Sequence, residues 1–349
     1  MDSLLVVAPN WLGDAVMALP AIGDVARAHP GARLTVAARS SVAPLFTMVD
    51  GVASVVTLRS RGGLPWPAAI GEDAAALAAG GYDAALLLPN AFQAAWLVHR
   101  AGVPERWGLA TDMRARLLTR AVAKPRGRMH QAEYYQALVR GLGFELGPCH
   151  AQVQVSPGGR TAAASTLASR GLAEGAPYVA MAPGAAYGRA KQWLPERFAA
   201  LATRLAVERG TATVLVGSAG DAPVCAAIAR AVTAVPDAVN LAGETDIPAL
   251  AGVLAAARAV VANDSGAMHL ASAVGAPVAA LFGATDERRT APLPRGLVAP
   301  VPAVLTGQAW CRPCLLRECP IDHRCMRSLG VEAVFARVAA WLDLPPGDR

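Results

Sequence analysis

The turn at residues 263–266, Asn-Asp-Ser-Gly, joins residue types that suit the binding of a phosphate or a ribose. Asp264 and Ser265 stand between a buried strand and a segment with helical spacing, 268–274. Backbone N–H groups are unpaired at the start of a helix and the helix dipole is positive there, so the turn attracts anions. His269 follows on the same face of the helix. The alternative interpretation is an ordinary helix cap, since Asp and Ser are favoured in that role.

A second candidate is the loop at residues 182–193, "APGAAYGRAKQW", which follows an apolar strand. Gly184 lies near its start, and Arg189 and Lys191 lie near its end. A loop of small residues lets backbone N–H groups wrap a diphosphate, and the ammonium group adds positive charge. Lysine occurs in this chain only at positions 124 and 191, so Lys191 stands out among the arginines. A solvated surface loop is the alternative, and the Walker A pattern of ATPases is missing here.

The turn after the first apolar run, "APNWLGDAVMALP" at residues 8–20, carries a single carboxylate. Gly13 permits a tight turn, and Asp14 stands at the start of the following helix. A lone carboxylate there is either a helix cap or a general base facing a cleft. The dinucleotide pattern G-x-G-x-x-G needs three glycines where this turn has one, which disfavours a dehydrogenase.

Four of the six cysteines fall in one short stretch, "CRPCLLRECPIDHRC", with His323 among them. The spacing C-x₂-C-x₄-C-x₅-C predicts a tetrahedral structural zinc site in a reducing compartment. An iron–sulfur cluster and free thiols are the alternatives. The four candidate ligands are Cys311, Cys314, Cys319 and Cys325.

The elements that must position these residues alternate between short apolar runs and helical patterns. In the first half we expect strands at 4–8, 34–37, 52–58 and 84–88, with helices at 15–29 and 93–99. In the second half we expect strands at 178–182, 213–216, 260–262 and 278–282, with helices at 160–170, 195–209, 222–232, 247–257, 268–274 and 331–342. Strands separated by helices predict two α/β, doubly wound, Rossmann-like domains with a ligand cleft at the carboxyl ends of the strands.

Turn residues cluster around 156–176, which predicts a linker there. The expected domains are 1–165 and 166–330. The segment 331–349 is expected to form a C-terminal helix that packs back across the boundary.

Composition excludes several classes of protein. The chain has 349 residues, a net charge of +6 and 5% aromatic residues. So few aromatic residues disfavour a base-stacking nucleic-acid surface, whereas the positive charge suits an anionic substrate or membrane surface. No apolar run is long enough to span a membrane, and the N-terminus lacks the pattern of a signal peptide. We therefore expect a cytoplasmic protein that binds no nucleic acid.

Taken together and in this order, the motifs resemble those of the ADP-heptose:lipopolysaccharide heptosyltransferases. The segments that carry the resemblance are "PNWLGDAVMALP", "APGAAYGRAKQWLPERFAAL", "NLAGETDIPAL" and "NDSGAMHLASAVGAPVAALFG", followed by Thr285 and Asp286. The resemblance spans residues 4–293 and implies the GT-B fold, in which two Rossmann-like domains face a central cleft. It also implies an inverting glycosyltransferase that needs no metal for catalysis, in which the domain at 1–165 binds the acceptor and the domain at 166–330 binds the nucleotide sugar.

The resemblance implies a role for each matched position. Asp14 matches the general base that takes the proton of the acceptor hydroxyl, and Lys191 matches the lysine near the donor diphosphate. The other donor-binding positions are Gly184, Asp221, Thr245, Asp264, Ser265, Gly266 and His269. The acceptor candidates are Asn10, Arg59, Arg61 and Arg120.

The resemblance further implies the reaction and its partners. The donor is ADP-heptose, and the acceptor is the heptosyl-Kdo₂-lipid A inner core of lipopolysaccharide. The enzyme would work in the cytoplasm, in peripheral contact with the inner face of the inner membrane. One alternative is a related transferase with another nucleotide sugar or acceptor, and another is a catalytically silent protein that binds sugar nucleotides.

Overall fold

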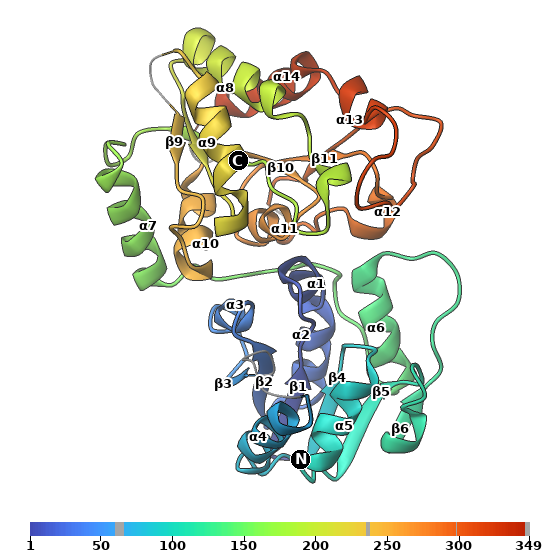
Figure 1. Ribbon diagram of the computed structural model, residues 1–349. Coiled ribbons are helices and arrows are strands. Elements are labelled where there is room, and N and C mark those ends of the chain that lie inside the picture. The colour runs from blue at the N-terminus through green and yellow to red at the C-terminus, as the bar shows by residue number, and fades with distance from the viewer. Residues whose placement is uncertain (60–65, 235–237, 298, 346–349) are drawn as a thin grey trace. The chain divides into compact units, whose positions relative to one another are not determined.

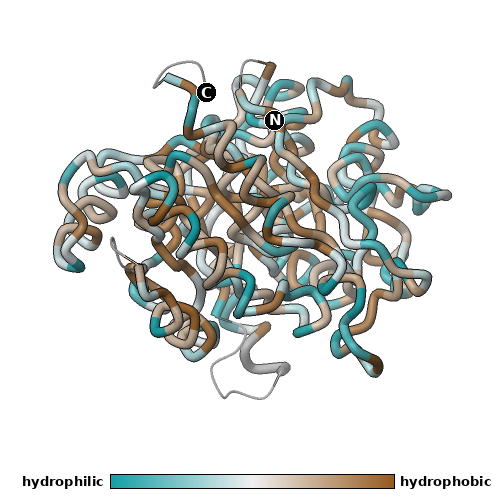
Figure 2. Tube along the Cα trace, turned by 90° about the horizontal axis from the view of Figure 1, so that it is seen from above, coloured by the Kyte–Doolittle hydropathy of each residue, from teal (hydrophilic) through white to brown (hydrophobic). Residues whose placement is uncertain are grey.

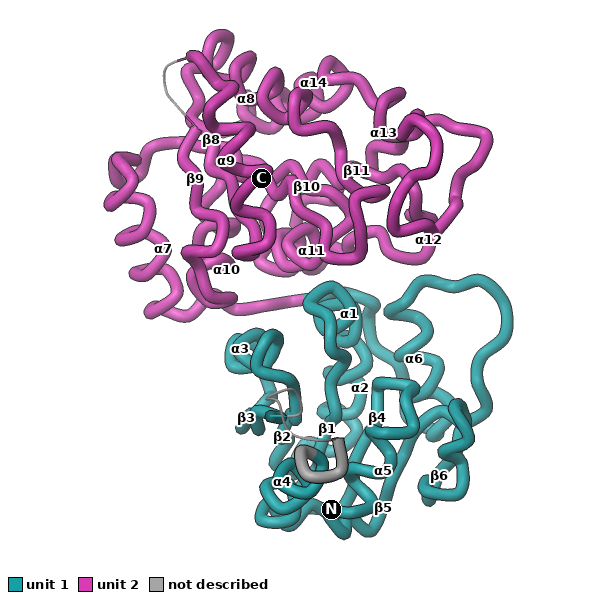
Figure 3. Tube along the Cα trace, viewed as in Figure 1, with its two compact units in different colours: residues 1–151 teal, residues 152–349 magenta. Residues whose placement is uncertain are grey.

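The computed structural model describes residues 1–59, 66–234, 238–297 and 299–345, and it divides the chain into two compact units. Unit 1 comprises residues 1–151 and unit 2 comprises residues 152–349 (Figure 3). Each unit is an α/β domain built on a parallel sheet of six strands, as expected (Figure 1).

In unit 1 the strand order is β3-β2-β1-β4-β5-β6. The strands are β1 (Ser3–Val7), β2 (Arg33–Arg39), β3 (Ser54–Leu58), β4 (Ala84–Leu87), β5 (Glu105–Leu109) and β6 (Arg120–Val122). The helices are α1 (Leu12–Met17), α2 (Leu19–Ala28), α3 (Ala43–Phe46), α4 (Trp66–Ala78), α5 (Phe92–Arg100), the 3₁₀ turn η1 (Ala115–Leu117) and α6 (Gln131–Gly141). The chain moves outward from β1 on one side and returns to β4 on the other, so the topological switch point lies between β1 and β4.

Unit 2 repeats this topology with the strand order β12-β11-β10-β7-β8-β9. Its strands are β7 (Tyr178–Ala182), β8 (Ala212–Leu215), β9 (Ala238–Asn240), β10 (Ala259–Asn263), β11 (Val278–Phe282) and β12 (Ala303–Thr306). Its helices are α7 (Pro157–Ser169), η2 (Arg189–Lys191), α8 (Pro195–Arg209), η3 (Ala219–Asp221), α9 (Ala222–Ala231), α10 (Ile247–Ala256), α11 (Gly266–Ala273), α12 (Glu287–Thr290), α13 (Arg324–Ser328) and α14 (Val331–Leu342). The switch point of this unit lies between β7 and β10.

The central strands of unit 2 are apolar because helices cover both faces of a parallel sheet. Every residue of β7, β10 and β11 is buried, and Val260 pairs with Ala180 and Val278 in the register of the sheet. Figure 2 shows the hydrophobic stretches running through the interior and the hydrophilic stretches in the outer loops. No helix among the described residues is long and apolar enough to cross a lipid bilayer.

The division between the units lies earlier than the sequence predicts. We expected it at 165/166, whereas the chain divides at 151/152 and α7 belongs to unit 2. Small residues explain the placement of α7, because a Cβ atom on Gly252 of α10 would lie 2.5 Å from the carbonyl oxygen of Gly159 and 2.7 Å from Cβ of Ala163. The two helices therefore approach each other closely, and α7 packs on α10.

The helix expected at 15–29 is two helices, α1 and α2, which meet at Ala18. Pro20 is the second residue of α2 and has no N–H to donate to the preceding turn, which explains the interruption.

The C-terminal helix α14 packs within unit 2, which differs from the expectation that it crosses the boundary. Phe335 and Val338 of α14 share a core with Phe198 and Leu205 of α8. Indole Nε1 of Trp193 also donates to the carbonyl of Leu329, 2.8 Å away, just before the helix begins. The amphipathic face of α14 is thus buried against the unit that carries it.

Candidate functional site

The candidate donor site lies at the carboxyl edge of the unit 2 sheet, where the loops after β7, β8, β9, β10 and β11 meet. Lys191 comes from the loop after β7, and Asp264 follows β10 directly. These two strands flank the switch point, which is where open α/β sheets bind their ligands. The sequence prediction that these two residues share one site agrees with this placement.

Lys191 and Asp264 form a charge-assisted hydrogen bond across the switch point. The Nζ atom of Lys191 lies 2.7 Å from Oδ2 of Asp264, and the two side chains are 14% and 5% exposed. The same ammonium group lies 4.9 Å from the centre of the Tyr187 ring. An ammonium has three N–H donors, so Lys191 can bind an oxygen of a ligand while it keeps Asp264.

Asn263 holds both ends of the loop that carries Lys191. Its Nδ2 donates to the carbonyl of Pro183 at 2.7 Å, and its Oδ1 accepts from the backbone N–H of Trp193 at 2.9 Å. The Asn263 side chain is fully buried. The loop is therefore anchored to the neighbouring strand β10, and this anchoring fixes the position of the Lys191 backbone.

Thr285, in the loop after β11, is a further partner of the ion pair. Its hydroxyl donates to Oδ2 of Asp264 at 2.7 Å, so the oxygen that accepts from Lys191 also accepts from Thr285. The sequence motif includes Thr285 but assigns it no role. Only the three-dimensional structure brings it to Asp264.

The start of α11 lies beside the pair. Ser265 occupies the N-cap position without making a side-chain cap bond, and its buried Oγ has no hydrogen-bond partner among the described residues. Gly266 is the first helical residue, and His269 is 3% exposed on the same short helix. The alternative of an ordinary Ser265 cap is therefore not supported. A helix N-terminus with an unpartnered hydroxyl is complementary to phosphate oxygens.

Asp221 and Thr245 lie at the β8 and β9 side of the same edge. Oδ2 of Asp221 accepts from the backbone N–H of Ser218 at 2.9 Å and from its hydroxyl at 2.7 Å, which closes the η3 turn. A Cβ atom on Gly184 would lie 2.2 Å from this carboxyl group, so a glycine is required where the two loops meet. Thr245 is half-buried, just before α10. The structure thus gives Asp221 a capping function close to the loop of Lys191.

In unit 1, Asp14 lies in the first turn of α1, which follows β1 at that unit's switch point. The N-cap is Trp11, which makes no side-chain cap bond, so the alternative interpretation of Asp14 as the cap of this helix is not supported. Burial raises the pKa of Tyr135 on α6, and the charge of Asp14 raises it further, which places the carboxylate near this phenol. Asn10 is exposed in the same loop.

The acceptor candidate Arg120 lies away from Asp14 in the sheet of unit 1. Arg120 lies on the edge strand β6, separated from β1 by β4 and β5. Its guanidinium donates to the carbonyl of Leu142 and lies 5.3 Å from the centre of the Trp107 ring. Arg59 is exposed after β3, and Arg61 lies outside the described residues.

A buried arginine that the sequence does not single out lies under the carboxyl edge of β4 and β5. Arg114 is fully buried, and it donates to the carbonyls of Leu109 at 3.0 Å and of Pro89. Burial lowers its pKa to about 10, which leaves the group protonated at neutral pH. It therefore holds the loops after β4 and β5 together and adds positive charge to this edge.

The four clustered cysteines are all free thiols in this structure. Cys325 is buried, and burial raises the pKa of its thiol, as do the nearby Cys311, Cys314 and Cys319. The four thiols thus share one neighbourhood. Within the described part of the chain, however, no group of three or more His, Cys, Asp or Glu side chains is placed to hold a metal ion.

Residues 73–324 of the chain match the protein family described as Glycosyltransferase family 9 (heptosyltransferase). The chain is 32% identical over 308 residues to Lipopolysaccharide heptosyltransferase 2 of Escherichia coli (strain K12), covering 83% of this chain and 85% of that protein. It is 28% identical over 305 residues to Lipooligosaccharide heptosyltransferase 2 of Haemophilus influenzae, covering 83% and 86%.

Among solved structures, that of E. coli ADP-heptose lps heptosyltransferase II superimposes with a TM-score of 0.81 at 27% identity, covering 98% of each chain. E. coli heptosyltransferase WaaC with ADP superimposes with a TM-score of 0.72 at 19% identity, covering 97% of this chain and 99% of that one, and is similar in fold.

Proposed function

Because this chain belongs to glycosyltransferase family 9, the heptosyltransferases, we propose that it performs the reaction of heptosyltransferase II. It would transfer L-glycero-D-manno-heptose from ADP-heptose to the heptosyl-Kdo₂-lipid A inner core during lipopolysaccharide biosynthesis. Its two Rossmann-like units are those of the GT-B fold. The observation that carries the proposal is the Lys191–Asp264 pair at the switch point of unit 2, beside the start of α11.

The donor diphosphate would bind to Lys191 and to the N-terminus of α11. Lys191 supplies an ammonium group that is 14% exposed, and Ser265 supplies a hydroxyl without a partner among the described residues. Positive charge and backbone N–H groups together stabilise a diphosphate most strongly when it leaves, because negative charge develops on it in the transition state. His269, Gly266, Asp221, Thr245 and Gly184 complete the proposed donor site.

Asp14 would act as the general base of an inverting displacement. Its carboxylate takes the proton of the acceptor hydroxyl while that oxygen forms a bond to the anomeric carbon of the heptose. The bond between the anomeric carbon and the phosphate oxygen breaks on the opposite face, and ADP leaves with the electron pair. Lys191 and the N-terminus of α11 stabilise the charge that develops on ADP, and on this proposal the displacement itself requires no metal ion.

The acceptor is lipid-linked, so we propose that the protein works in the cytoplasm, in peripheral contact with the inner membrane. The net charge of +6 suits an anionic lipid surface and an acidic inner core. Asn10, Arg59 and Arg61 remain acceptor candidates in unit 1. Arg120 is the least suited of the four acceptor candidates, because its guanidinium already binds the carbonyl of Leu142 and lies over the Trp107 ring.

We also propose a structural zinc ion at Cys311, Cys314, Cys319 and Cys325. Four thiols in one neighbourhood are the donor set that zinc prefers. Their positions in this structure are not those of a formed site, so binding would need the segment to tighten around the metal. A zinc ion there would be structural and would take no part in the transfer.

Incubation of the protein with ADP-heptose and heptosyl-Kdo₂-lipid A, followed by mass spectrometry, tests the proposed reaction. The expected product is the acceptor with one added heptose, together with ADP. Transfer from another nucleotide sugar, or only to another acceptor, would indicate a related transferase. Binding of ADP-heptose without any transfer would indicate a silent binding protein.

A further inference from the structure

The segment that carries the clustered cysteines, residues 309–325, contacts two of the loops that form the proposed donor site, those after β7 and β11. We refer to it as the cysteine segment. It contacts the loop after β11 through Arg312 and Leu315, and the loop after β7 through Leu315 and Arg317. None of these contacts involves a cysteine side chain.

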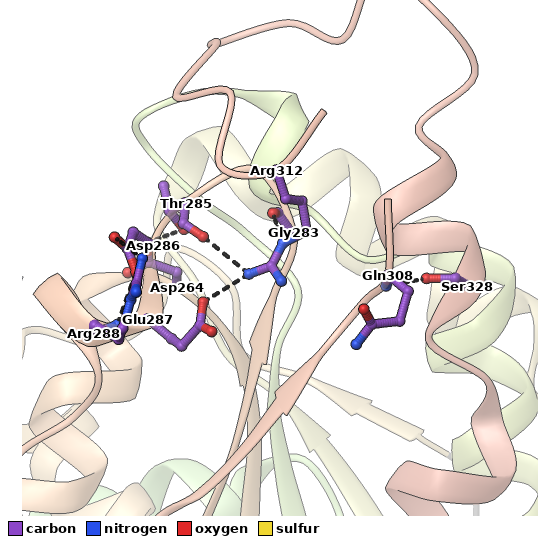
Figure 4. Close-up of polar contacts among 9 residues, drawn as sticks. All are labelled: Asp264, Gly283, Thr285, Asp286, Glu287, Arg288, Gln308, Arg312 and Ser328. Atoms are coloured by element: carbon purple, nitrogen blue, oxygen red, sulfur yellow. Dashed lines mark hydrogen bonds and ion pairs between the residues drawn. The ribbon is translucent and has the colours of Figure 1, made fainter. Parts of the chain in front are cut away.

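Arg312 binds the loop after β11 at three points. Its guanidinium donates to the carbonyl of Gly283, to the carbonyl of Thr285 at 3.1 Å and to the carboxylate of Glu287 at 2.7 Å (Figure 4). The Arg312 side chain is only 13% exposed. The backbone N–H of Leu315 donates to the carbonyl of Ala284, the residue between Gly283 and Thr285, at 2.9 Å. Three successive carbonyls of this loop are therefore held by the cysteine segment.

The loop that Arg312 holds presents Thr285 to the ion pair. The Thr285 hydroxyl donates to Oδ2 of Asp264 at 2.7 Å, and the ammonium of Lys191 lies 2.7 Å from the same oxygen. A carboxylate oxygen that accepts from two donors is held more firmly in one orientation than an oxygen with one donor. Thr285 thereby restrains the carboxylate to which Lys191 is attached.

The cysteine segment holds the Lys191 loop as well. The hydroxyl of Tyr187 donates to the carbonyl of Leu315 at 2.8 Å, and the N–H of Ala190 donates to the carbonyl of Arg317 at 2.9 Å. A Cβ atom on Gly188 would lie 2.3 Å from that same Arg317 oxygen, so the backbones are in close contact. Both partners of the ion pair are thus positioned from one segment.

We propose that Arg312 and Thr285 are positioning residues for donor binding. Arg312 holds the loop after β11, Thr285 orients Asp264, and Asp264 places the ammonium of Lys191 where it receives the donor diphosphate. The inference rests on the proposed donor site. It adds two residues that act through Asp264 and do not themselves touch the substrate.

Thr285→Val is the sharpest variant, because it keeps the shape of the side chain and removes only the hydroxyl. We expect it to raise the KM for ADP-heptose about tenfold, which is the lower end of the effect of a lost hydrogen bond to a charged group because Thr285 acts only through Asp264. The acceptor KM and the melting temperature stay near those of the wild type. Thr285→Ser keeps the hydroxyl and restores the donor KM. Arg312→Lys keeps the charge but cannot bind three acceptors as a planar fork, so it raises the donor KM in the same direction.

Ser328→Ala is the matched control. The hydroxyl of Ser328 accepts from the backbone N–H of Gln308 at 2.6 Å and donates to the carbonyl of Cys325 at 2.8 Å. Ser328 therefore stabilises the same region of unit 2, but its hydrogen bonds reach neither the loop after β7 nor the loop after β11 (Figure 4). We expect an unchanged donor KM in this variant. A wild-type donor KM in Thr285→Val, or an equal rise in the acceptor KM, would overturn the proposal.

The Lys191→Ala variant tests the donor site independently of the positioning residues. Calorimetry with ADP as the probe should show weaker binding in this variant than in the wild type. Unchanged ADP binding in Lys191→Ala would refute the donor site itself. If Lys191→Ala binds ADP more weakly but Thr285→Val keeps the ADP affinity and donor KM of the wild type, the donor site stands. That result would refute only the assignment of Thr285 and Arg312 as positioning residues.

Discussion

The Nζ atom of Lys191 lies 2.7 Å from Oδ2 of Asp264, and the bond joins the loops after two strands that flank the switch point of unit 2. The pair is nearly buried, so little solvent screens it. An ammonium held in this way is already oriented before a ligand arrives, and no entropy is lost in ordering it during the reaction.

Replacing Lys191 with Ala should raise the donor KM and lower kcat, because the charge contributes most as the diphosphate leaves. We expect kcat/KM to fall about a hundredfold. Lys191→Arg should recover only part of the activity, since a planar guanidinium does not reproduce a compact ammonium bound to Asp264. Steady-state kinetics with varied ADP-heptose measure both effects, and wild-type constants in both variants would remove Lys191 from the site.

Replacing Asp14 with Asn should abolish most of the transfer while the protein stays folded. Asp14 is not the N-cap of α1, and Asn has nearly the same shape and keeps a side-chain oxygen that accepts hydrogen bonds. An amide cannot accept the proton of the acceptor hydroxyl, and a general base contributes about 10²- to 10⁴-fold to the rate. The variant should melt near the wild-type temperature and bind ADP-heptose normally. An active Asp14→Asn enzyme would contradict the mechanism but not the family.

Replacing Asn263 with Leu should destabilise unit 2 and weaken donor binding together. The change removes the bonds to Pro183 and Trp193 and leaves a buried carbonyl and a buried N–H without partners. Each such group costs about 1–3 kcal/mol in the free energy of unfolding. Urea denaturation should show the lower stability, and the donor KM should rise because the Lys191 loop is released. Ser169→Ala on α7 is a suitable control, since that hydroxyl is exposed and donates only to the carbonyl of Thr166.

The purified protein should contain about one zinc ion per chain, bound by the cysteine segment. Elemental analysis before and after dialysis against a chelator measures the metal. Cys314→Ser should lower the zinc content, whereas Cys225→Ser should not, because Cys225 is buried elsewhere in unit 2 and burial raises its pKa to about 12. A metal-free wild-type protein with four titratable thiols in the segment would contradict the zinc proposal.

Much of the donor site was accessible from the sequence because its signals are local. Apolar runs such as 178–182 and 260–262 predict buried parallel strands, and residues that follow such strands meet at one edge of the sheet. These signals make the turn of Asp264 and the loop of Lys191 separate candidates for phosphate binding, and the resemblance to the heptosyltransferases assigns both residues to one donor site. Hydrophobic spacing also predicts a helix at 268–274, and the structure places this helix, α11, at Gly266–Ala273.

Other features depend on contacts between residues that are far apart in the chain. The hydroxyl of Thr285, the fork of Arg312 and the buried guanidinium of Arg114 are ordinary side chains in the sequence, and only packing gives them partners. Packing also decides that the Arg120 guanidinium binds the carbonyl of Leu142, and that α7 packs on α10 of unit 2 at Gly252. Secondary structure follows from neighbouring residues, whereas hydrogen bonds across loops are decided by how the sheets and helices pack. The sequence alone therefore determined the two folds and the candidate residues Lys191 and Asp264, whereas the tertiary structure decided that these two residues pair and which residues hold the pair in place.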